Sequence, residues 1–153
     1  MSEPTLSVGN NTVAEAIVLA METFAFVSAW PTDDRSEPVD GLYCAVEYTG
    51  EQHGRLCMIA PKKLGWTLAA NVFSQDIADE GVRDRGPDAL REIMNVACGA
   101  LCRQVCPGAA VELNLPICRT VEYSEWRTAM DRPGVVVLEA EENIIAVWLE
   151  GSA

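Results

Sequence analysis

Basic residues are scarce in this sequence. Its 153 residues include 11 lysines and arginines against 23 aspartates and glutamates, which gives a formal net charge of −12 at pH 7. Binding to the phosphate backbone of nucleic acid requires a basic surface, so we expect no nucleic acid as the main ligand. No lysine or arginine precedes Arg35, and the basic start of a secretory signal is therefore missing too.

Long hydrophobic runs are also missing. The most apolar stretch, "AIVLAMETFAFVSAW", is interrupted by Glu22 and ends before Pro31. It is too short and too polar to span a membrane, so we expect a cytoplasmic protein without membrane contact. In the cytoplasm cysteines stay reduced and pack as small hydrophobic residues. This applies to all six cysteines: Cys44, Cys57, Cys98, Cys102, Cys106 and Cys118.

Motifs of metal and nucleophilic catalysis are absent. The one histidine, His53, falls in a predicted hairpin turn, which gives no support to histidine acid–base or triad chemistry. The sequence has no phosphate-cradling glycine loop and no zinc-binding helix motif. Cys98, Cys102 and Cys106 are evenly spaced, but successive positions drift by about 40° around a helix and no second ligand cluster accompanies them. We interpret them as packing residues and expect this chain to bind no metal and no cofactor.

Hydrophobic spacing predicts one α+β domain over 1–153, with its core from about residue 12 to residue 149. We expect an antiparallel sheet packed with long helices, and the order of elements suggests a pseudo-two-fold helix–strand–strand repeat. The predicted elements are a helix over 12–29, strands over 42–49 and 54–60, helices over 61–74 and 87–105, and strands over 109–123, 134–140 and 143–150.

Local signals set several of these boundaries. Thr12 and Glu15 fit a capping box, Pro61 fits a first helical position, and the strand over 109–123 should be irregular around Pro116. The acidic, arginine-rich segment 75–86 is predicted to be a loop. The closing strands offer an apolar edge to which a second copy could add. The tryptophans should belong mainly to the core, with Trp126 and Trp148 as possible exceptions near a sheet edge.

The predicted helix over 87–105 has two distinct sides. At roughly 100° per residue, the core side carries Leu90, Met94, Ala97, Leu101 and Val105. On the opposite side Glu92, Asn95 and Gly99 fall within about 60° of one another, with Asp88 and Arg103 beside them. Glycine costs a helix roughly 1 kcal/mol against alanine, which is understandable if another surface approaches the backbone there. From the residues alone, an ordinary solvated face remains the alternative.

This helix resembles the signature helix of the CheC/CheX family of chemotaxis phosphatases. The family signature is an Asp or Ser, then Glu-x-x-Asn, then a small residue or glycine four positions on. Its matches here are Asp88, Glu92, Asn95 and Gly99. The segments "GRLCMIAPKKLGWTLAANVF" and "ELNLPICRT" are similar to the family's neighbouring strand–helix and Leu-Pro strand, so the resemblance spans about 12–149.

The chain departs from the family pattern in two places. Ala100 stands where the family often has asparagine. The second Glu-x-x-Asn motif of CheC-type members is absent from the first helix, because Val18 follows Glu15 and Ala25 follows Glu22. A single site per chain is similar to the CheX type.

The resemblance implies a phosphatase that hydrolyses the aspartyl phosphate of a CheY-like response regulator in chemotaxis or two-component signalling. Asn95 would hold and aim the attacking water and Glu92 would pair with the regulator's lysine, while Asp88, Gly99 and Arg103 would contact the partner. The regulator would supply Mg²⁺, and the chain would form a homodimer. The alternative is a non-catalytic module that binds a response regulator or a flagellar-switch component.

Four of the eleven basic residues surround the same helix: Arg83, Arg85, Arg91 and Arg103. They could form a local positive patch that steers an acidic regulator, or they could simply solvate the helix end and the loop.

Overall fold

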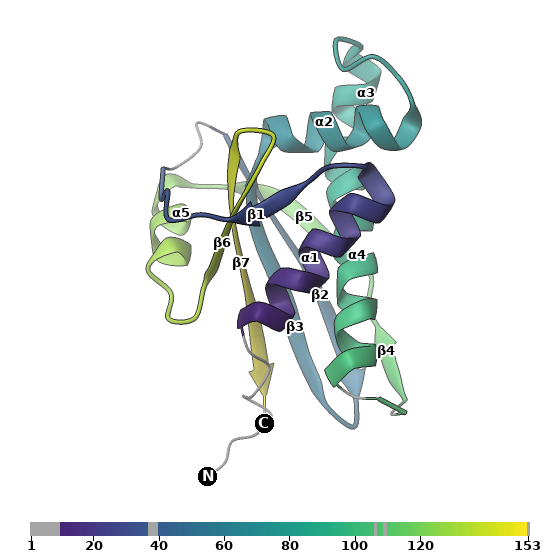
Figure 1. The fold of residues 1–153 in the computed structure, drawn as a ribbon, viewed down its shortest axis with the longest axis vertical. Helices are drawn as coiled ribbons and strands as arrows, with labels where there is room; N and C mark the ends of the chain where they lie inside the picture. Colours follow the sequence, from purple (N-terminus) through teal and green to yellow (C-terminus); the bar gives the residue numbers. More distant parts are fainter. Residues whose placement is uncertain (1–9, 37–39, 106, 109, 153) are drawn as a thin grey trace.

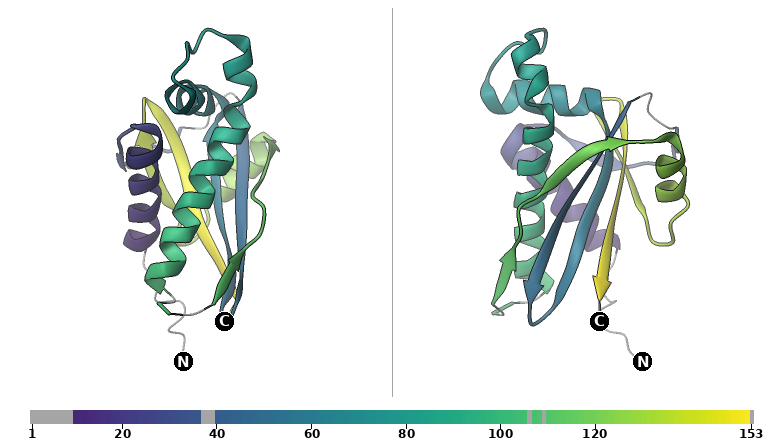
Figure 2. Two further views of the ribbon diagram at one scale, coloured as in Figure 1. Left: turned by 90° about the vertical axis from the view of Figure 1, so that its right-hand side faces the viewer. Right: turned by 180° about the vertical axis from the view of Figure 1, so that it is seen from behind.

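The computed structural model describes residues 10–36, 40–105, 107–108 and 110–152, which form a seven-stranded sheet with helices on both faces (Figures 1 and 2). In chain order the elements are α1 (Asn10–Ala25), β1 (Ala29–Pro31), β2 (Gly41–Gly50), β3 (His53–Pro61), α2 (Lys62–Phe73), α3 (Glu80–Asp84), α4 (Gly86–Val105), β4 (Val111–Leu113), β5 (Ile117–Val121), α5 (Tyr123–Met130), β6 (Val136–Ala140) and β7 (Asn143–Ser152). The predicted α+β class with an antiparallel sheet is confirmed.

The strands lie in the order β1-β6-β7-β3-β2, and β4 and β5 both pair with the outer side of β2. Every pairing among the described strands is antiparallel. The predicted hairpins of β2 with β3 and of β6 with β7 are confirmed. The closing hairpin offers less free edge than expected, because β6 lies between β1 and β7, and β7 pairs with β3 on one side and, over residues 143–147, with β6 on the other. Pairing with a second copy stays a prediction.

Side chains alternate between two hydrophobic clusters, one on each face of the sheet. The larger cluster joins the sheet to α1, α2 and α4. The smaller one lies under α5, on the opposite side of the sheet from α1 and α4 (Figure 2). Trp126 and Trp148 belong to this second cluster and are only 1% and 6% exposed, so they are core residues and not the exceptions expected. The exposed large aromatics include Phe26 and Trp30 instead.

Helix α1 differs from its prediction at both ends. Its described part begins at Asn10, so Thr12 lies inside the helix and does not cap it. It ends at Ala25 and not at residue 29, because Phe26 adopts a φ of 58° and the amide of Val27 donates to the carbonyl of Met21. The chain then continues into β1, which the sequence did not predict.

Three further corrections concern shorter elements. The predicted loop over 75–86 contains α3, whose N-cap Asp79 accepts a hydrogen bond from the amide of Gly81. Helix α5, which was not predicted, begins with a capping box formed by Glu122 and Glu125. Pro61 is the N-cap of α2 and not its first helical residue.

The strand predicted over 109–123 is interrupted before and at Pro116, as expected, and splits into β4 and β5. Among the described residues, no helix combines the length and apolar character that crossing a membrane requires.

Candidate functional site

The rotation of α4 is fixed by its buried side. Leu90, Met94 and Ala97 have no exposed surface and Leu101 is 2% exposed, while Val105 packs against the same cluster at its margin. These are the residues that helical spacing assigned to the core, so that prediction is confirmed. With this side held against α1, α2 and the sheet, the opposite ridge of α4 must face outward.

The beginning of α4 is held close to α2 by two glycines. A β-carbon on Gly86 would lie 3.2 Å from the carbonyl carbon of Gly65, and one on Gly65 would lie 3.2 Å from the carbonyl oxygen of Gly86. Side chains at either position would push the helices apart. This contact places the first turn of α4 beside the N-terminal part of α2.

The outward ridge of α4 brings the predicted site residues together. Glu92 is exposed and Asn95 is half-buried. Within the described ranges neither side chain has a hydrogen-bond or ion-pair partner. Asp88 is exposed and forms an ion pair with Arg91, one turn along the helix. The polar atoms of Glu92 and Asn95 are therefore available to another molecule.

Gly99 is not required by the packing of this chain. A β-carbon there would meet the Nη1 of Arg103 at 3.6 Å and the Cδ1 of Leu113 at 3.9 Å, which are ordinary van der Waals distances. A glycine that weakens a helix without relieving a contact of its own needs another explanation, such as close approach of a second surface.

Glu92 and Asn95 line an open groove of about 850 Å³. One wall is formed by Phe24 of α1 and by Val72 and Phe73 of α2. The other wall is the segment Leu113–Pro116, which runs from the last residue of β4 to the start of β5 and which we call the strap. The side chain of Leu115 on this strap is 88% exposed. These apolar walls were not predicted from the sequence, although the Leu-Pro pair of "ELNLPICRT" belongs to the strap.

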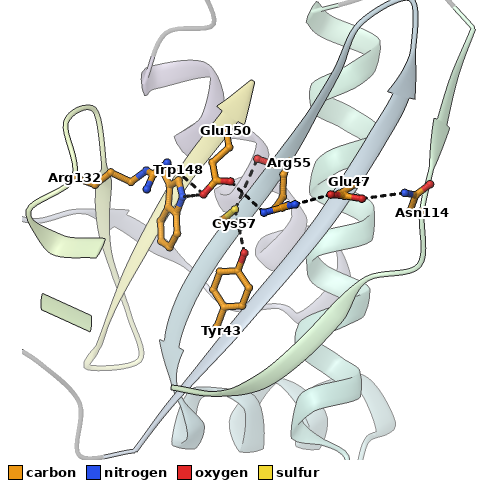
Figure 3. Close-up of polar contacts among 8 residues, drawn as sticks. All are labelled: Tyr43, Glu47, Arg55, Cys57, Asn114, Arg132, Trp148 and Glu150. Atoms are coloured by element: carbon orange, nitrogen blue, oxygen red, sulfur yellow. Dashed lines mark hydrogen bonds and ion pairs between the residues drawn. The ribbon is translucent and has the colours of Figure 1, made fainter. Parts of the chain in front are cut away.

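The strap is anchored to the sheet through Asn114 (Figure 3). The backbone N–H of Asn114 donates to the backbone carbonyl of Glu47 at 2.8 Å. Its side-chain Nδ2 donates to Glu47 Oε1 at 3.2 Å. The Glu47 carboxylate also pairs with Arg55 at 2.6 Å, and Arg55 reaches Glu150 at 3.3 Å. Hydrogen bonds from Arg55 and Asn114 lower the pKa of Glu47. These contacts hold the polar side of the strap on β2 and leave Leu115 in the solvent beside the groove.

Three of the four arginines near α4 have partners within the chain. Arg83 stacks on Trp66 at 4.4 Å and donates to the carbonyl of Ile77, and Arg85 stacks on Phe73 at 3.4 Å. Arg91 pairs with Asp88. Arg103 is exposed, lies next to Gly99, and forms no ion pair with any residue that the structure describes. Of the four arginines that could steer an acidic regulator, Arg103 is therefore the one without an ion pair or an aromatic contact among the described residues.

The evenly spaced cysteines and the one histidine were interpreted from the sequence as residues without a catalytic or metal-binding role. Cys98 and Cys102 are buried in the core, and Cys106 lies outside the described residues. His53 is an exposed residue at the start of β3. Over the ranges that the structure covers, no group of three or more histidine, cysteine, aspartate or glutamate side chains is placed to hold a metal ion.

Solved structures with the same fold come from several bacteria. CheX in the "CheX-CheY-BeF3-Mg+2 complex" from Borrelia burgdorferi matches with a TM-score of 0.64 and 13% identity over 94% of this chain and 97% of that one. Chemotaxis protein CheX from Vibrio vulnificus matches with a TM-score of 0.64 and 14% identity, over 92% of this chain and 95% of that one. FliY from Thermotoga maritima matches with a TM-score of 0.56 and 15% identity, over 96% of this chain and 90% of that one. Identities this low establish the fold alone.

Sequence comparison is more specific about the family. No curated protein matches the sequence. The family model described as "Chemotaxis phosphatase CheX" matches residues 42–138, which run from β2 into β6 and contain all of α4 with its outward ridge. The match covers more than half of the chain, and the protein therefore belongs to the CheX family of chemotaxis phosphatases.

Proposed function

We propose that this protein hydrolyses the aspartyl phosphate of a CheY-like response regulator, with Asn95 and Glu92 as the catalytic residues. The observation that carries the proposal is the position of both side chains. They stand next to each other on the outward ridge of α4, in an open groove, without a partner among the described residues.

Asn95 would hold and aim the attacking water. Hydrolysis of an acyl phosphate needs little covalent help from the protein, because most of the acceleration comes from in-line positioning and charge neutralisation. A carboxamide can accept one hydrogen bond from water and donate another, whereas a carboxylate would place negative charge against an anionic phosphoryl group. Water attacks the phosphorus, the bond to the aspartyl oxygen breaks, and inorganic phosphate leaves.

Glu92 would set the register between the two proteins. Its exposed carboxylate could pair with the lysine in the regulator's phosphorylation pocket. Asp88 and Arg103 would contact the regulator on either side, and Gly99 would let its surface approach the helix backbone. Mg²⁺ would come from the regulator and neutralise charge on the phosphoryl group, a role for which this chain needs no ligands of its own.

The decisive experiment measures phosphate release from a regulator charged with a small acyl phosphate. We expect the protein to accelerate release, Asn95→Ala to abolish the acceleration, and binding of Asn95→Ala to the regulator to be partly retained. Gln104→Ala is the matched control, because it removes an exposed amide from α4 away from the ridge. Full activity of Asn95→Ala would refute the role of Asn95. Binding by the wild-type protein without any phosphate release would favour the non-catalytic binding module.

A homodimer is part of the same proposal. In the described sheet a second copy could extend the strands at β1, at β4 and β5, or at the end of β7 beyond Val147, which pairs with β3 alone. Sedimentation equilibrium would determine the mass in solution, and a monomer throughout the micromolar range would exclude a stable dimer.

A further inference from the structure

Two cysteines face each other across neighbouring strands near the groove. Cys44 of β2 lies directly opposite Cys118 of β5 in the antiparallel register. The thiol of Cys44 donates a hydrogen bond to the sulfur of Cys118, and the two Sγ atoms are 2.6 Å apart. Both residues are free cysteines.

The backbone at this position already has the geometry of a disulfide. A disulfide joins residues with Cα atoms roughly 4.4–6.8 Å apart. Directly opposed residues of an antiparallel pair are separated by about 4.5 or 5.5 Å, depending on their hydrogen bonding. An S–S bond could thus form here without moving either strand. The thiols of Cys98 and Cys102, one turn apart on α4, are also hydrogen-bonded to each other, but both residues are buried in the core. Cys57 lies on the other face of the sheet.

The two thiols differ in access to solvent. Cys44 is fully buried in the core, whereas the side chain of Cys118 is partly exposed because β5 pairs only with β2. A small oxidant can therefore reach Cys118 first, and the resulting species would have Cys44 as its immediate neighbour.

The charges around Cys118 favour its reactive form. The hydrogen bond from Cys44 lowers the pKa of the Cys118 thiol, and the guanidinium of Arg91 lowers it further, while burial and the Asp88 carboxylate oppose these effects. The same hydrogen bond and burial raise the pKa of Cys44, which remains a thiol. Thiolates are the form that reacts with oxidants, so the exposed member of the pair is also the activated one.

We propose that Cys44 and Cys118 are an oxidisable pair that hydroperoxides convert into a cross-strand disulfide. The Cys118 thiolate attacks the peroxide oxygen, the O–O bond breaks, and Cys118 becomes a sulfenic acid. The sulfur of Cys44 then attacks that sulfur while the Cys44 proton passes to the departing hydroxyl, so the S–S bond forms and water leaves. In total two thiols and one hydrogen peroxide give one disulfide and two waters, and a dithiol reductant reverses the change.

The bond would have a local structural consequence. Cys118 follows the strap by two residues, and β5 is held to the sheet along one side only. A covalent link to β2 would restrain β5 and the end of the strap. The proposal concerns the chemistry of this pair and does not depend on the phosphatase activity.

Peptide mapping tests the pair directly. The intact protein is treated with hydrogen peroxide, remaining thiols are blocked, and a non-reducing digest is analysed by mass spectrometry. We expect one major cross-linked peptide joining Cys44 to Cys118, lost after dithiothreitol. It should persist in Cys102→Ser, the matched control that removes another cysteine with a lowered pKa, and vanish in Cys118→Ser.

Several results would overturn the proposal. These are a different cysteine pairing in the wild-type protein, no disulfide at all, or accumulation of Cys118 as sulfinic acid without a cross-link. The wild-type map decides even if the Cys118→Ser variant does not fold. Hydrogen exchange provides a second measurement: slower exchange over residues 117–121 after oxidation supports the expected restraint, and faster exchange would show that the bond distorts β5.

Discussion

Replacing Gly99 with alanine should make this protein more stable and, at the same time, a poorer phosphatase. The new β-carbon would lie 3.6 Å from Arg103 Nη1 and 3.9 Å from Leu113 Cδ1, so the chain can accept it without strain. Alanine is favoured over glycine inside a helix by up to about 1 kcal/mol. The free energy of unfolding should rise by about 0.5–1 kcal/mol, which raises the melting temperature by roughly 1–4 °C in a domain of this size.

The same methyl group should interfere with docking if the regulator approaches α4 at Gly99. Overpacking at a close contact costs about 1–3 kcal/mol. That corresponds to a loss of affinity of roughly 5- to 150-fold. We would measure thermal unfolding and the concentration dependence of phosphate release for Gly99→Ala, with Gln104→Ala as the helix-surface control. A less stable Gly99→Ala would mean that the fold itself requires the glycine. Unchanged affinity would mean that no surface approaches the helix there.

Three further predictions concern single side chains. Glu92→Lys should weaken binding to the phosphorylated regulator by reversing the charge that meets its lysine; a binding titration tests this, and wild-type affinity would exclude the ion pair. Arg103→Gln should slow association and reduce its dependence on salt, as seen in stopped-flow measurements, and an unaltered on-rate would remove electrostatic steering. Burial raises the pKa of Cys57 to about 12, so its thiol stays protonated at pH 8. Iodoacetamide should therefore modify Cys118 well before Cys57 in the native protein, and rapid labelling of Cys57 would contradict its burial.

Helix α4 could be predicted because its signals are local. Its apolar residues repeat with the helical period over five turns, and the repeat distinguishes a buried side from an outward ridge. The structure places Leu90 and Met94 in the core and Glu92 on the surface, as this pattern requires. The outward position of Glu92 and Asn95 could be predicted for the same reason, and the resemblance to the CheC/CheX signature then marked them as candidate catalytic residues.

Short elements escaped prediction because neighbouring segments stabilise them. Helices α3 and α5 have five and eight residues, too few for a hydrophobic period to stand out, and helices of this length depend on tertiary contacts. Trp126 looked exposed because charged residues adjoin it in the sequence. It is buried because α5 folds back over the far face of the sheet.

Pairing between distant segments also could not be predicted. Strand β1 has three residues and exists because it pairs with β6, more than one hundred positions later in the chain. That pairing covers the edge of β6, the first strand of the closing hairpin. The walls of the groove could not be predicted for the same reason, because Phe73 and the strap reach α4 from separate parts of the sequence.

The role of Asn95 can be separated from folding, because its side chain contributes little to the stability of the chain. It has no hydrogen-bond partner among the described residues, and asparagine is a poorer helix former than alanine by roughly 0.5 kcal/mol. Asn95→Ala should therefore leave the free energy of unfolding unchanged or raise it by about 0.5 kcal/mol, while phosphate release is lost. Leu90→Ala, which removes a fully buried side chain from the other side of α4, should instead cost about 2–5 kcal/mol. Chemical denaturation of both variants provides the comparison. A destabilised Asn95→Ala would show that the amide serves the fold, and its loss of activity would then say nothing about catalysis.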